Sequence, residues 1–324
     1  MLRRREVILA GSGLALAAAS GPSLAQEFPR AGFPVKYVVP FPPGGLTDVM
    51  ARTVAQKLSE AWSVPVVVEN KAGGNAQIGA EQVARSAPDG GNLLAITLAH
   101  AANVSLFPHA SYNFSKDLRS VALLAGSPML VVVPANSSIR DFRDLQSVAK
   151  TRALNAGSSG NGTPPHLTMA LFNDINKSEM THVPYRGGVP AITDLIGGQL
   201  DVIFSNFPES IAQVKAGKLK PIALCSASRH AMLPDVPTTA EAGMPGLLVE
   251  NWTGAMLPTA TPDAIVEKFA REMIKIMSSA EVEDRAKQQG FIITPKGPQD
   301  FAAFLKAEIE RWARIIKIAK ITAS

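Results

Sequence analysis

Short apolar strands alternate with amphipathic helices along most of the chain, and no other feature of the sequence restricts its fold more. Residues 35–40 have the pattern of a strand, residues 47–62 that of a helix with one apolar face, and residues 64–69 that of a second strand. The alternation continues to about residue 226. Strands separated by helices predict an α/β fold with parallel sheets, whose ligand sites lie at the carboxyl ends of the strands.

The size and composition of the chain are those of a globular protein and exclude several other classes. Its 324 residues predict one large or two medium-sized domains, and a hydrophobic fraction of 46% excludes wholesale disorder. The single cysteine, Cys225, excludes an intramolecular disulfide and a CxxC site, and its apolar surroundings predict a buried side chain. The formal net charge of +5 is too small to indicate a nucleic-acid partner.

The first 25 residues have the pattern of a secretory signal peptide. Three arginines precede an apolar run at residues 7–19, and Ser23-Leu24-Ala25 supplies the small-x-small pattern of a cleavage site. This run of 13 residues is shorter than the roughly 20 that cross a bilayer, so we expect export and cleavage after Ala25. Arg4-Arg5 also fits a twin-arginine pattern, which leaves the Sec and Tat routes both open.

The loop at residues 41–48, Phe-Pro-Pro-Gly-Gly-Leu-Thr-Asp, joins the first predicted strand to the first predicted helix. Gly44 and Gly45 leave backbone N–H groups uncovered, and Thr47 or Asp48 is suited to cap the helix. Amides at the positive end of a helix dipole bind anions, so this loop predicts a pocket for a negatively charged group. An ordinary tight turn with a routine cap explains the same residues, and neither a P-loop nor a GxGxxG motif is present.

Two further loops have the same character, at residues 71–77 and 157–165, and each precedes a predicted helix. The second of them carries Ser159, Asn161 and Thr163 among three glycines, which are neutral hydrogen-bond donors on an adaptable backbone. Three such helix entrances together predict a site that recognises its ligand by preformed hydrogen bonds. Each bond to a ligand carboxylate would be charge-assisted, worth roughly 1.5–3 kcal/mol.

Signals of catalysis, of a metal and of a cofactor are weak throughout the chain. Ser159 lacks the second glycine of a Gly-x-Ser-x-Gly elbow, and the five histidines show no HExxH spacing. His166 lies just inside a predicted helix and is interpreted as structural. We therefore expect no enzyme, no metal and no cofactor. An exported hydrolase that uses Ser159 or Asp48 stays as an alternative, and it requires a histidine within hydrogen-bond reach of the nucleophile.

A series of motifs follows in order along the chain after residue 26. They are Val39-Pro-Phe-Pro-Pro-Gly-Gly45, Val68-Glu-Asn70, Ala87-Pro-Asp-Gly90, Gly157-Ser-Ser-Gly-Asn-Gly-Thr-Pro-Pro-His166, His182-Val-Pro-Tyr-Arg-Gly187, Asp194-Leu-Ile-Gly-Gly-Gln-Leu-Asp201 and Leu233-Pro-Asp-Val-Pro-Thr238. With these motifs the chain resembles the Bug family, the periplasmic solute-binding receptors of tripartite tricarboxylate transporters. The resemblance covers essentially everything that follows the predicted signal peptide.

The resemblance implies a type II periplasmic-binding-protein fold, in which two α/β domains joined by two crossing strands close on a ligand like a hinged trap. By this analogy residues 27–126 and 250–324 form one domain and residues 127–249 the other. The resemblance also assigns ligand contacts to residues of both domains. They are Gly44, Gly45, Thr47, Gly74, Asn75, Ser159, Asn161, Thr163, Tyr185, Gly187 and Ser205.

Two departures from the family pattern concern this predicted site. The second loop usually has more glycine where this chain has Asn75-Ala76-Gln77, and Ala76 is poorly suited to a positive φ. Many relatives have an aspartate near position 205, where this chain has Ser205-Asn206. A cleft that lacks this carboxylate is expected to favour an anionic ligand over an amine.

The resemblance thus implies a monomeric periplasmic receptor that captures a small carboxylate and delivers it to the membrane subunits of a tripartite tricarboxylate transporter. A sensing role, through a membrane sensor kinase, is the alternative within the same class of protein. Neither the resemblance nor the residues identify the carboxylate.

Overall fold

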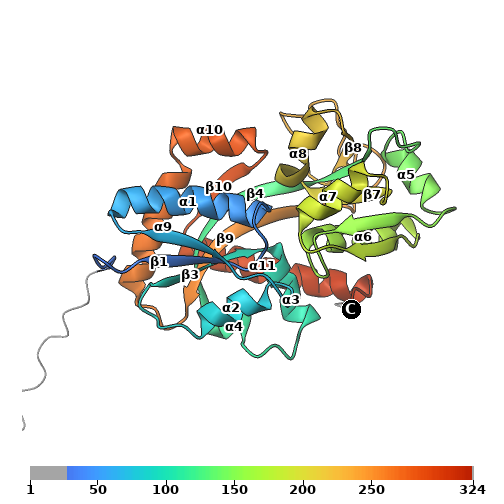
Figure 1. The fold of residues 1–324 in the computed structure, drawn as a ribbon. Helices are drawn as coiled ribbons and strands as arrows, with labels where there is room; N and C mark the ends of the chain where they lie inside the picture. Colours follow the sequence, from blue (N-terminus) through green and yellow to red (C-terminus); the bar gives the residue numbers. More distant parts are fainter. Residues whose placement is uncertain (1–27, 323–324) are drawn as a thin grey trace, which may run out of the picture.

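The computed structural model describes residues 28–322, so the predicted signal peptide lies outside the described residues. Two mixed β-sheets, each flanked by helices, form the two halves of the molecule (Figure 1). Strand β4 (Leu118–Pro134) belongs to both sheets. Its first part pairs with β9 (Glu250–Pro258), and from Met129 onward it pairs with strands of the second half.

The sheet of the first half has parallel strands on one side and antiparallel strands on the other. Its order is β2-β1-β3-β9-β4, and β10 also pairs with β4. Besides β4 and β9, its strands are β1 (Val35–Val39), β2 (Val66–Asn70), β3 (Asn92–Thr97) and β10 (Ile292–Lys296). The loops after β1, β2 and β3 all reach the boundary with the second half, where they line a common cleft.

Helices cover both faces of this first sheet. They are α1 (Leu46–Trp62), α2 (Gln77–Ala84), α3 (Leu98–Leu106), α4 (Phe114–Asp117), α9 (Asp263–Met277) and α10 (Ala280–Gln288). Apolar residues three or four positions apart place one face of α1 and of α9 in the same core, where Val54, Leu58 and Phe269 are fully buried around Tyr37 of β1. Burying each large apolar side chain contributes roughly 1.5–3 kcal/mol. This packing anchors the start of α1 beside the cleft.

The second half repeats this plan on a smaller scale. Its strands β5 (Asn155–Ser158), β6 (Thr181–Pro184) and β7 (Val202–Asn206) are parallel in the order β7-β5-β6, while β7 and β8 (Leu219–Leu224) pair antiparallel with β4. Its helices are α5 (Phe142–Val148), α6 (Pro164–Asn176), α7 (Gly188–Ile196) and α8 (Phe207–Lys215). The loops after β5 and β6 face those of the first half.

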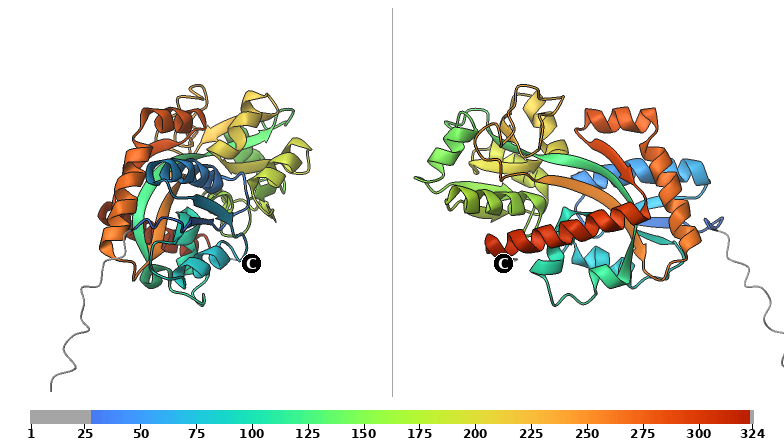
Figure 2. Two further views of the ribbon diagram at one scale, coloured as in Figure 1. Left: turned by 60° about the vertical axis from the view of Figure 1, so that its left-hand side comes forward. Right: turned by 180° about the vertical axis from the view of Figure 1, so that it is seen from behind.

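Helix α11 (Pro298–Ile318) runs along the back of the molecule and joins the two halves (Figure 2). In the first half, Trp252 Nε1 of β9 donates a hydrogen bond of 2.9 Å to Glu308 Oε2 of α11. Further along α11, Arg311 donates to the carbonyl oxygen of Leu248. Ile321, just after the helix, is buried in a cluster that includes Phe172 of α6. The two halves are therefore connected by β4, β9 and α11.

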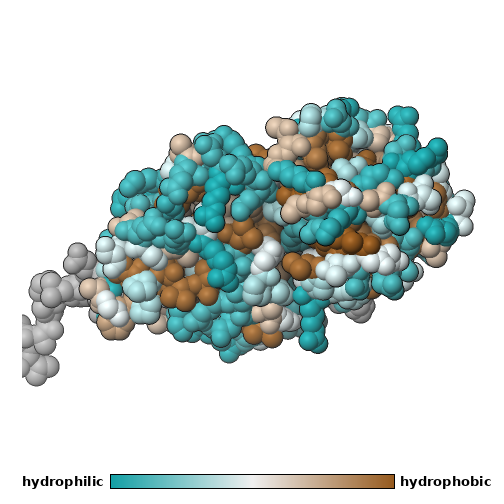
Figure 3. All heavy atoms as spheres, turned by 45° about the horizontal axis from the view of Figure 1, so that its top comes forward, coloured by the Kyte–Doolittle hydropathy of each residue, from teal (hydrophilic) through white to brown (hydrophobic). Residues whose placement is uncertain are grey.

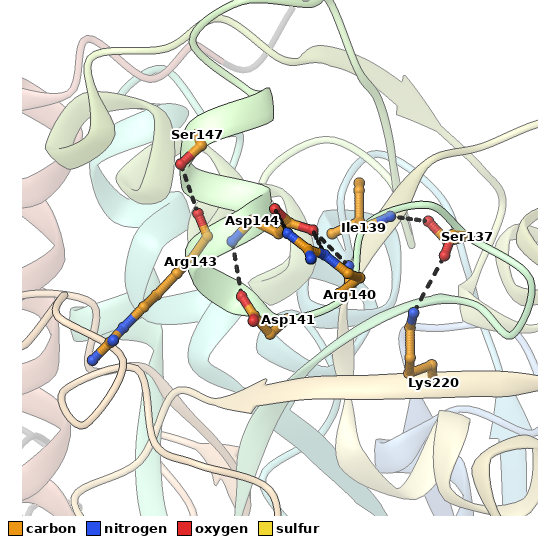
Figure 4. Close-up of polar contacts among 8 residues, drawn as sticks. All are labelled: Ser137, Ile139, Arg140, Asp141, Arg143, Asp144, Ser147 and Lys220. Atoms are coloured by element: carbon orange, nitrogen blue, oxygen red, sulfur yellow. Dashed lines mark hydrogen bonds and ion pairs between the residues drawn. The ribbon is translucent and has the colours of Figure 1, made fainter.

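Helix α5, at the outer end of the second half, is held by charged residues around its first turn (Figure 4). The Asp141 side chain caps the helix by accepting a hydrogen bond of 2.8 Å from Asp144 N. Asp144 in turn accepts hydrogen bonds from the Arg140 guanidinium, which hold the pKa of Asp144 at about 2. Lys220 Nζ of β8 donates to Ser137 O and so ties the sheet to the segment before α5.

The predicted strands and helices agree with the structure to within about two residues where they are present, but the expected parallel sheets are mixed sheets. Strands β4, β8, β9 and β10 run antiparallel to their neighbours because β4 and β9 pass in opposite directions between the halves. The apolar pattern of residues 130–134 predicts only the last part of β4, which begins at Leu118. Residues 118–134 are buried on both faces, so they lack the alternation that reveals a strand.

Cys225 is buried and unpaired, as its apolar surroundings predicted. Within residues 28–322, no helix is both long enough and apolar enough to cross a membrane.

Candidate functional site

A cleft lies between the two halves, where the loops after the parallel strands face one another. It consists of an inner cavity and a more open outer cavity. The residues that line both cavities are Phe41, Pro42, Ser159, Thr163, Arg186 and Gly187. When the top of the molecule is turned forward, apolar side chains gather between the hydrophilic surfaces of the two halves (Figure 3).

The cleft brings together eight of the eleven predicted ligand contacts. The inner cavity is lined by Gly45, Thr47, Ser159, Thr163 and Gly187, and the outer cavity by Gly74, Asn75, Tyr185 and three of the same residues. Gly44, Asn161 and Ser205 are not among the lining residues. Ser205 is buried and its hydroxyl donates to the carbonyl oxygen of Asn206. The neighbouring Asn206 lines the inner cavity instead.

The loop after β1 uses one of its glycine amides internally. Gly44 has a φ of +84°, and its N–H donates a hydrogen bond of 2.9 Å to Asp48 Oδ2, so the prediction of an uncovered amide at Gly44 is wrong. Asp48 also accepts from Arg52 Nε and from Asn70 Nδ2. Burial works against the charged form, but these three hydrogen bonds outweigh it and lower the pKa of Asp48. Asp48 therefore shapes the loop, and Gly45 caps α1 with no side-chain partner.

The loop after β2 adopts a left-handed conformation to which Ala76 is poorly suited. Gly74, Asn75 and Ala76 have φ values of +54°, +54° and +69°. The first two residues accommodate the left-handed region at low cost, whereas Ala76 occupies it against its intrinsic preference. Asn103 Nδ2 of α3 donates a hydrogen bond of 2.6 Å to Asn75 O, and Gln77 N donates to Gly74 O. These contacts hold the loop in the shape that lines the outer cavity.

The loop after β5 is organised by a serine and two histidines. Ser158 Oγ lies 2.6 Å from His182 Nε2 and accepts a hydrogen bond from Gly160 N. His166 Nδ1 accepts from Gly162 N, and its ring is stacked on His182 with centroids 4.0 Å apart. Burial lowers the pKa of both histidines to about 4, so both rings are neutral at physiological pH. This interaction agrees with the structural role predicted for His166.

This serine–histidine pair does not form a reactive site in the cleft. Ser158 is 1% exposed and does not line either cavity. The neighbouring Ser159 lines both cavities, but the described residues place no histidine in hydrogen bond with it. The hydroxyl of Tyr185 is also engaged, because it donates a hydrogen bond of 2.7 Å to Asp194 Oδ2. Within residues 28–322, no group of three His, Cys, Asp or Glu side chains is arranged to hold a metal ion.

A chain of buried polar side chains crosses the floor of the inner cavity, and sequence reasoning missed it. Thr97 Oγ1, at the end of β3, donates to Asn251 Oδ1 of β9 at 3.2 Å. Asn251 Nδ2 donates to Asn206 Oδ1, at the end of β7, at 2.8 Å. Asn206 Nδ2 then donates to Glu209 Oε1 at 3.0 Å. The chain runs from one half to the other, and it sets which amide atom each asparagine presents to its neighbour.

Glu209, in the first turn of α8, places a carboxylate at the inner end of the cleft. Its Oε1 also accepts a hydrogen bond of 3.3 Å from Leu46 N, in the first turn of α1, so this bond joins the two halves. Burial raises the pKa of Glu209 to about 7, although both hydrogen bonds oppose the rise. The expectation that the cleft lacks a carboxylate is therefore wrong. Ser205 has no carboxylate, but Glu209, four residues further on in α8, supplies one.

Gly188 and Arg186 complete the surroundings of Glu209. A Cβ atom on Gly188 would lie 2.0 Å from Glu209 Oε2, so the carboxylate occupies space that only glycine leaves open. Arg186 is exposed at the junction of the two cavities and makes no ion pair with any of residues 28–322. The cleft thus contains one carboxylate inside and one unpaired guanidinium at its entrance. The position of Asn206 and Glu209 just after a strand is the only sequence signal that could have indicated them.

Comparison with known proteins supports this architecture. The model of the tripartite tricarboxylate transporter family receptor matches residues 50–321. The structure of the periplasmic binding protein BugD is 30% identical in sequence and superposes with a TM-score of 0.85, covering 89% of this chain and 98% of that one. The two-domain α/β fold of a periplasmic binding protein is thereby confirmed.

Two solved structures from Rhodopseudomonas palustris are also similar to the chain, and both contain a carboxylate. Rpa4515 with adipate is 32% identical with a TM-score of 0.87, covering 90% of this chain and 99% of that one. MatC with bound malate is 31% identical with a TM-score of 0.81, covering 87% and 98%. Adipate and malate are both small dicarboxylates.

Proposed function

Since the chain belongs to the tripartite tricarboxylate transporter receptor family, we propose that it captures a small organic acid in the cleft between its halves and delivers it to the membrane subunits of such a transporter. Receptors of this family are periplasmic. We further propose that the chain reaches the periplasm through a signal peptide that is cleaved after Ala25.

One observation carries the proposed ligand class: the cleft presents neutral donors and one unpaired cation around its junction. Ser159 lines both cavities, Asn75 lines the outer one, and Arg186 lies at the junction with no ion pair to any of residues 28–322. Thr163 lines both cavities too, but its hydroxyl donates to Gly160 O and is not available to a ligand. The first-turn amide of Thr47 lies at the positive end of α1. A carboxylate satisfies such donors better than a neutral group, because each hydrogen bond to it is charge-assisted.

We propose that the two halves are domains, with residues 27–126 and 250–324 in one and 127–249 in the other. The change of partner along β4 supports this division, because Pro128 is the last residue that pairs with β9 and Met129 the first that pairs with β7. The eight predicted contacts that line the cleft come from both of these domains. Binding would then draw the domains together, with β4 and β9 as the hinge.

We infer a binding function without turnover. Asp48 is engaged by three hydrogen bonds. Near Ser159, His182 is bonded to Ser158 and His166 accepts a hydrogen bond from Gly162 N. Neither nucleophile of the hydrolase alternative therefore has the histidine that it requires.

We also propose that the receptor acts as a monomer. Deleting the gene and measuring uptake of the ligand would separate a transport role from a sensing role, since sensing alone would leave uptake by existing transporters unchanged.

A thermal-shift screen against mono-, di- and tricarboxylates tests the proposed function. A ligand at about 100 times its Kd stabilises the folded state by roughly 2.7 kcal/mol, which raises Tm by about 4 °C in a chain of this size. Neutral amides of the same acids serve as the control, and they should give a much smaller shift. The absence of any shift in Tm across a broad library of acids would contradict the proposal, as would hydrolysis of a bound ester.

A further inference from the structure

The two oxygens of the Glu209 carboxylate have different surroundings. Oε1 accepts hydrogen bonds from Leu46 N and Asn206 Nδ2, so its acceptor capacity is used. Oε2 lies against Gly188, beside the Ser159 hydroxyl, and no donor among residues 28–322 is hydrogen-bonded to it. The side chain is only partly buried and lines the inner cavity. One oxygen is therefore fixed by the protein, and the other is left for whatever occupies the cavity.

The elements packed around Glu209 present few other charges. Arg186 lines the same cavity, while Asp48 and Arg52 of α1 are paired with each other behind the first loop. His100 of α3 is buried against Phe41, and burial lowers the pKa of this histidine to about 4. One wall is apolar, with Leu46, Pro43, Val189 and Pro190, and the floor consists of the hydrogen-bonded side chains of Thr97, Asn251 and Asn206. Glu209 thus supplies the one carboxylate of the inner cavity.

We propose, on the basis of the function proposed above, that Glu209 determines specificity by selecting a ligand with a hydrogen-bond donor at the end opposite to its carboxylate. The donor is a hydroxyl, ammonium or amide group that meets Oε2 in the inner cavity. The ligand carboxylate then lies toward the junction with the outer cavity, near Arg186. A ligand with a carboxylate at both ends fits this arrangement poorly.

The physical reason is the repulsion of like charges in a confined space. An ionised Glu209 and a second ligand carboxylate would be close together in a confined cavity, where charges are screened less than in water. The Leu46 amide, which would otherwise hold a ligand anion at the start of α1, is already occupied by Glu209. A dicarboxylate can enter only if Glu209 or the ligand takes up a proton. A donor on the ligand needs no such change.

Calorimetric titration at about pH 8, above the pKa of about 7 of Glu209, tests this selection. Each set of titrants contains three compounds of equal carbon number: an α,ω-dicarboxylate such as adipate, its ω-hydroxy analogue and its ω-amino analogue. Corresponding sets based on glutarate and succinate vary the length of the ligand. We expect the hydroxy or amino acid of the best-fitting set to bind at least about tenfold more tightly than its dicarboxylate. In Glu209→Gln, whose amide donates to a carboxylate, this preference should vanish or reverse.

Two further variants keep the test clear. Gly188→Ala should shift the preference in the same direction as Glu209→Gln, because its Cβ displaces the carboxylate without changing any charge. Glu310→Gln removes an exposed carboxylate of α11, far from the cleft, and should leave the preference unchanged. A dicarboxylate that binds the natural protein as tightly as its analogues, or an unchanged preference in Glu209→Gln, would overturn the inference while leaving the proposed function intact. If no organic acid binds at all, the proposed function fails, and the inference fails with it.

Discussion

Gly45 is the residue whose lack of a side chain opens the start of α1 to the cleft. Its φ of −79° suits any residue, but a Cβ atom there would lie 3.3 Å from Glu209 Oε1. We expect Gly45→Val to weaken ligand binding by about tenfold or more without unfolding the protein, because the side chain covers the first-turn amides. Calorimetry gives the affinity and a thermal melt the stability.

Gly297→Val is the matched control for this variant. Gly297 is also the cap of a helix, α11, with a φ of −71° and a nearest contact of 3.8 Å, and it does not line the cleft. We expect this substitution to leave affinity unchanged. Unchanged affinity in Gly45→Val as well would contradict the assignment of the first loop to the site.

The pKa of Glu209 predicts how stability depends on pH. Its value of about 7 in the folded protein exceeds its ordinary value of 4.5, so the folded state binds this proton more tightly than the unfolded state does. Stability from this group is fully present below about pH 4.5 and is lost as pH rises to about 7, by no more than about 1.4 kcal/mol per pH unit.

Urea unfolding of the natural protein and of Glu209→Gln across this range measures the effect. The difference in unfolding free energy between the two should move in favour of the variant as pH rises from about 4.5 to about 7, and then stay constant. His166 and His182 lower stability below their ordinary pKa of 6.5 in both proteins, so their contribution cancels. A difference that does not depend on pH would show that folding does not raise the pKa of Glu209.

The residues of the three loops could be predicted from the sequence. Which of their hydrogen-bonding atoms remain without a partner in the protein could not. Glycine and small polar residues after predicted strands indicated a ligand site, and eight of eleven candidates line the cleft. Which donors stay available depends on partners far away in the chain. Leu46 N is occupied by a residue 163 positions later, and no spacing rule connects the two.

Helix α5 offers a test of element stability that is separate from ligand binding. Asp141 satisfies an amide of the first turn, and such a cap contributes about 1 kcal/mol. Asp141→Ala should therefore lower the unfolding free energy by about this amount in urea titration. Because α5 is at the outer end of the second half, affinity for the ligand should not change. A loss of affinity would mean that α5 and the cleft are coupled.

Helix α11 contains the buried contact that holds it to the hinge strand β9. Glu308→Ala would leave Trp252 Nε1 without its acceptor in a buried position, which costs about 1–3 kcal/mol. The loss should appear as a lower urea midpoint, and Glu308→Gln should recover much of it because the amide oxygen still accepts. Equal stability of Glu308→Ala and the natural protein would show that this bond contributes nothing.

Elements with a regular apolar pattern were predictable, and those with none were not. α1 has an apolar face with helical period, so its start was placed within one residue. The first part of β4 is buried almost throughout and has no period to detect. β9 is similar, since residues 251–258 are all buried. These two strands connect the halves. The sequence therefore indicated the elements within each half better than the strands that connect them.

At the scale of the whole molecule, the site exists only where the two halves meet. The bond from Leu46 N to Glu209 and the approach of Gly162 to Asn103 and Asn75 both join loops from different sheets. The arrangement of the halves could be expected only through the resemblance to a family, because neither composition nor periodicity specifies how two sheets face each other. The same arrangement explains why a ligand held by both halves would stabilise the whole chain.

Calorimetric titration of the tightest-binding acid, compared with the amide made from its carboxylate, tests the central claim most directly. If donors around the cleft junction recognise a carboxylate, the acid binds one-to-one and the amide binds at least about tenfold more weakly, because it lacks charge-assisted hydrogen bonds. Equal affinity for the acid and its amide would contradict a carboxylate receptor.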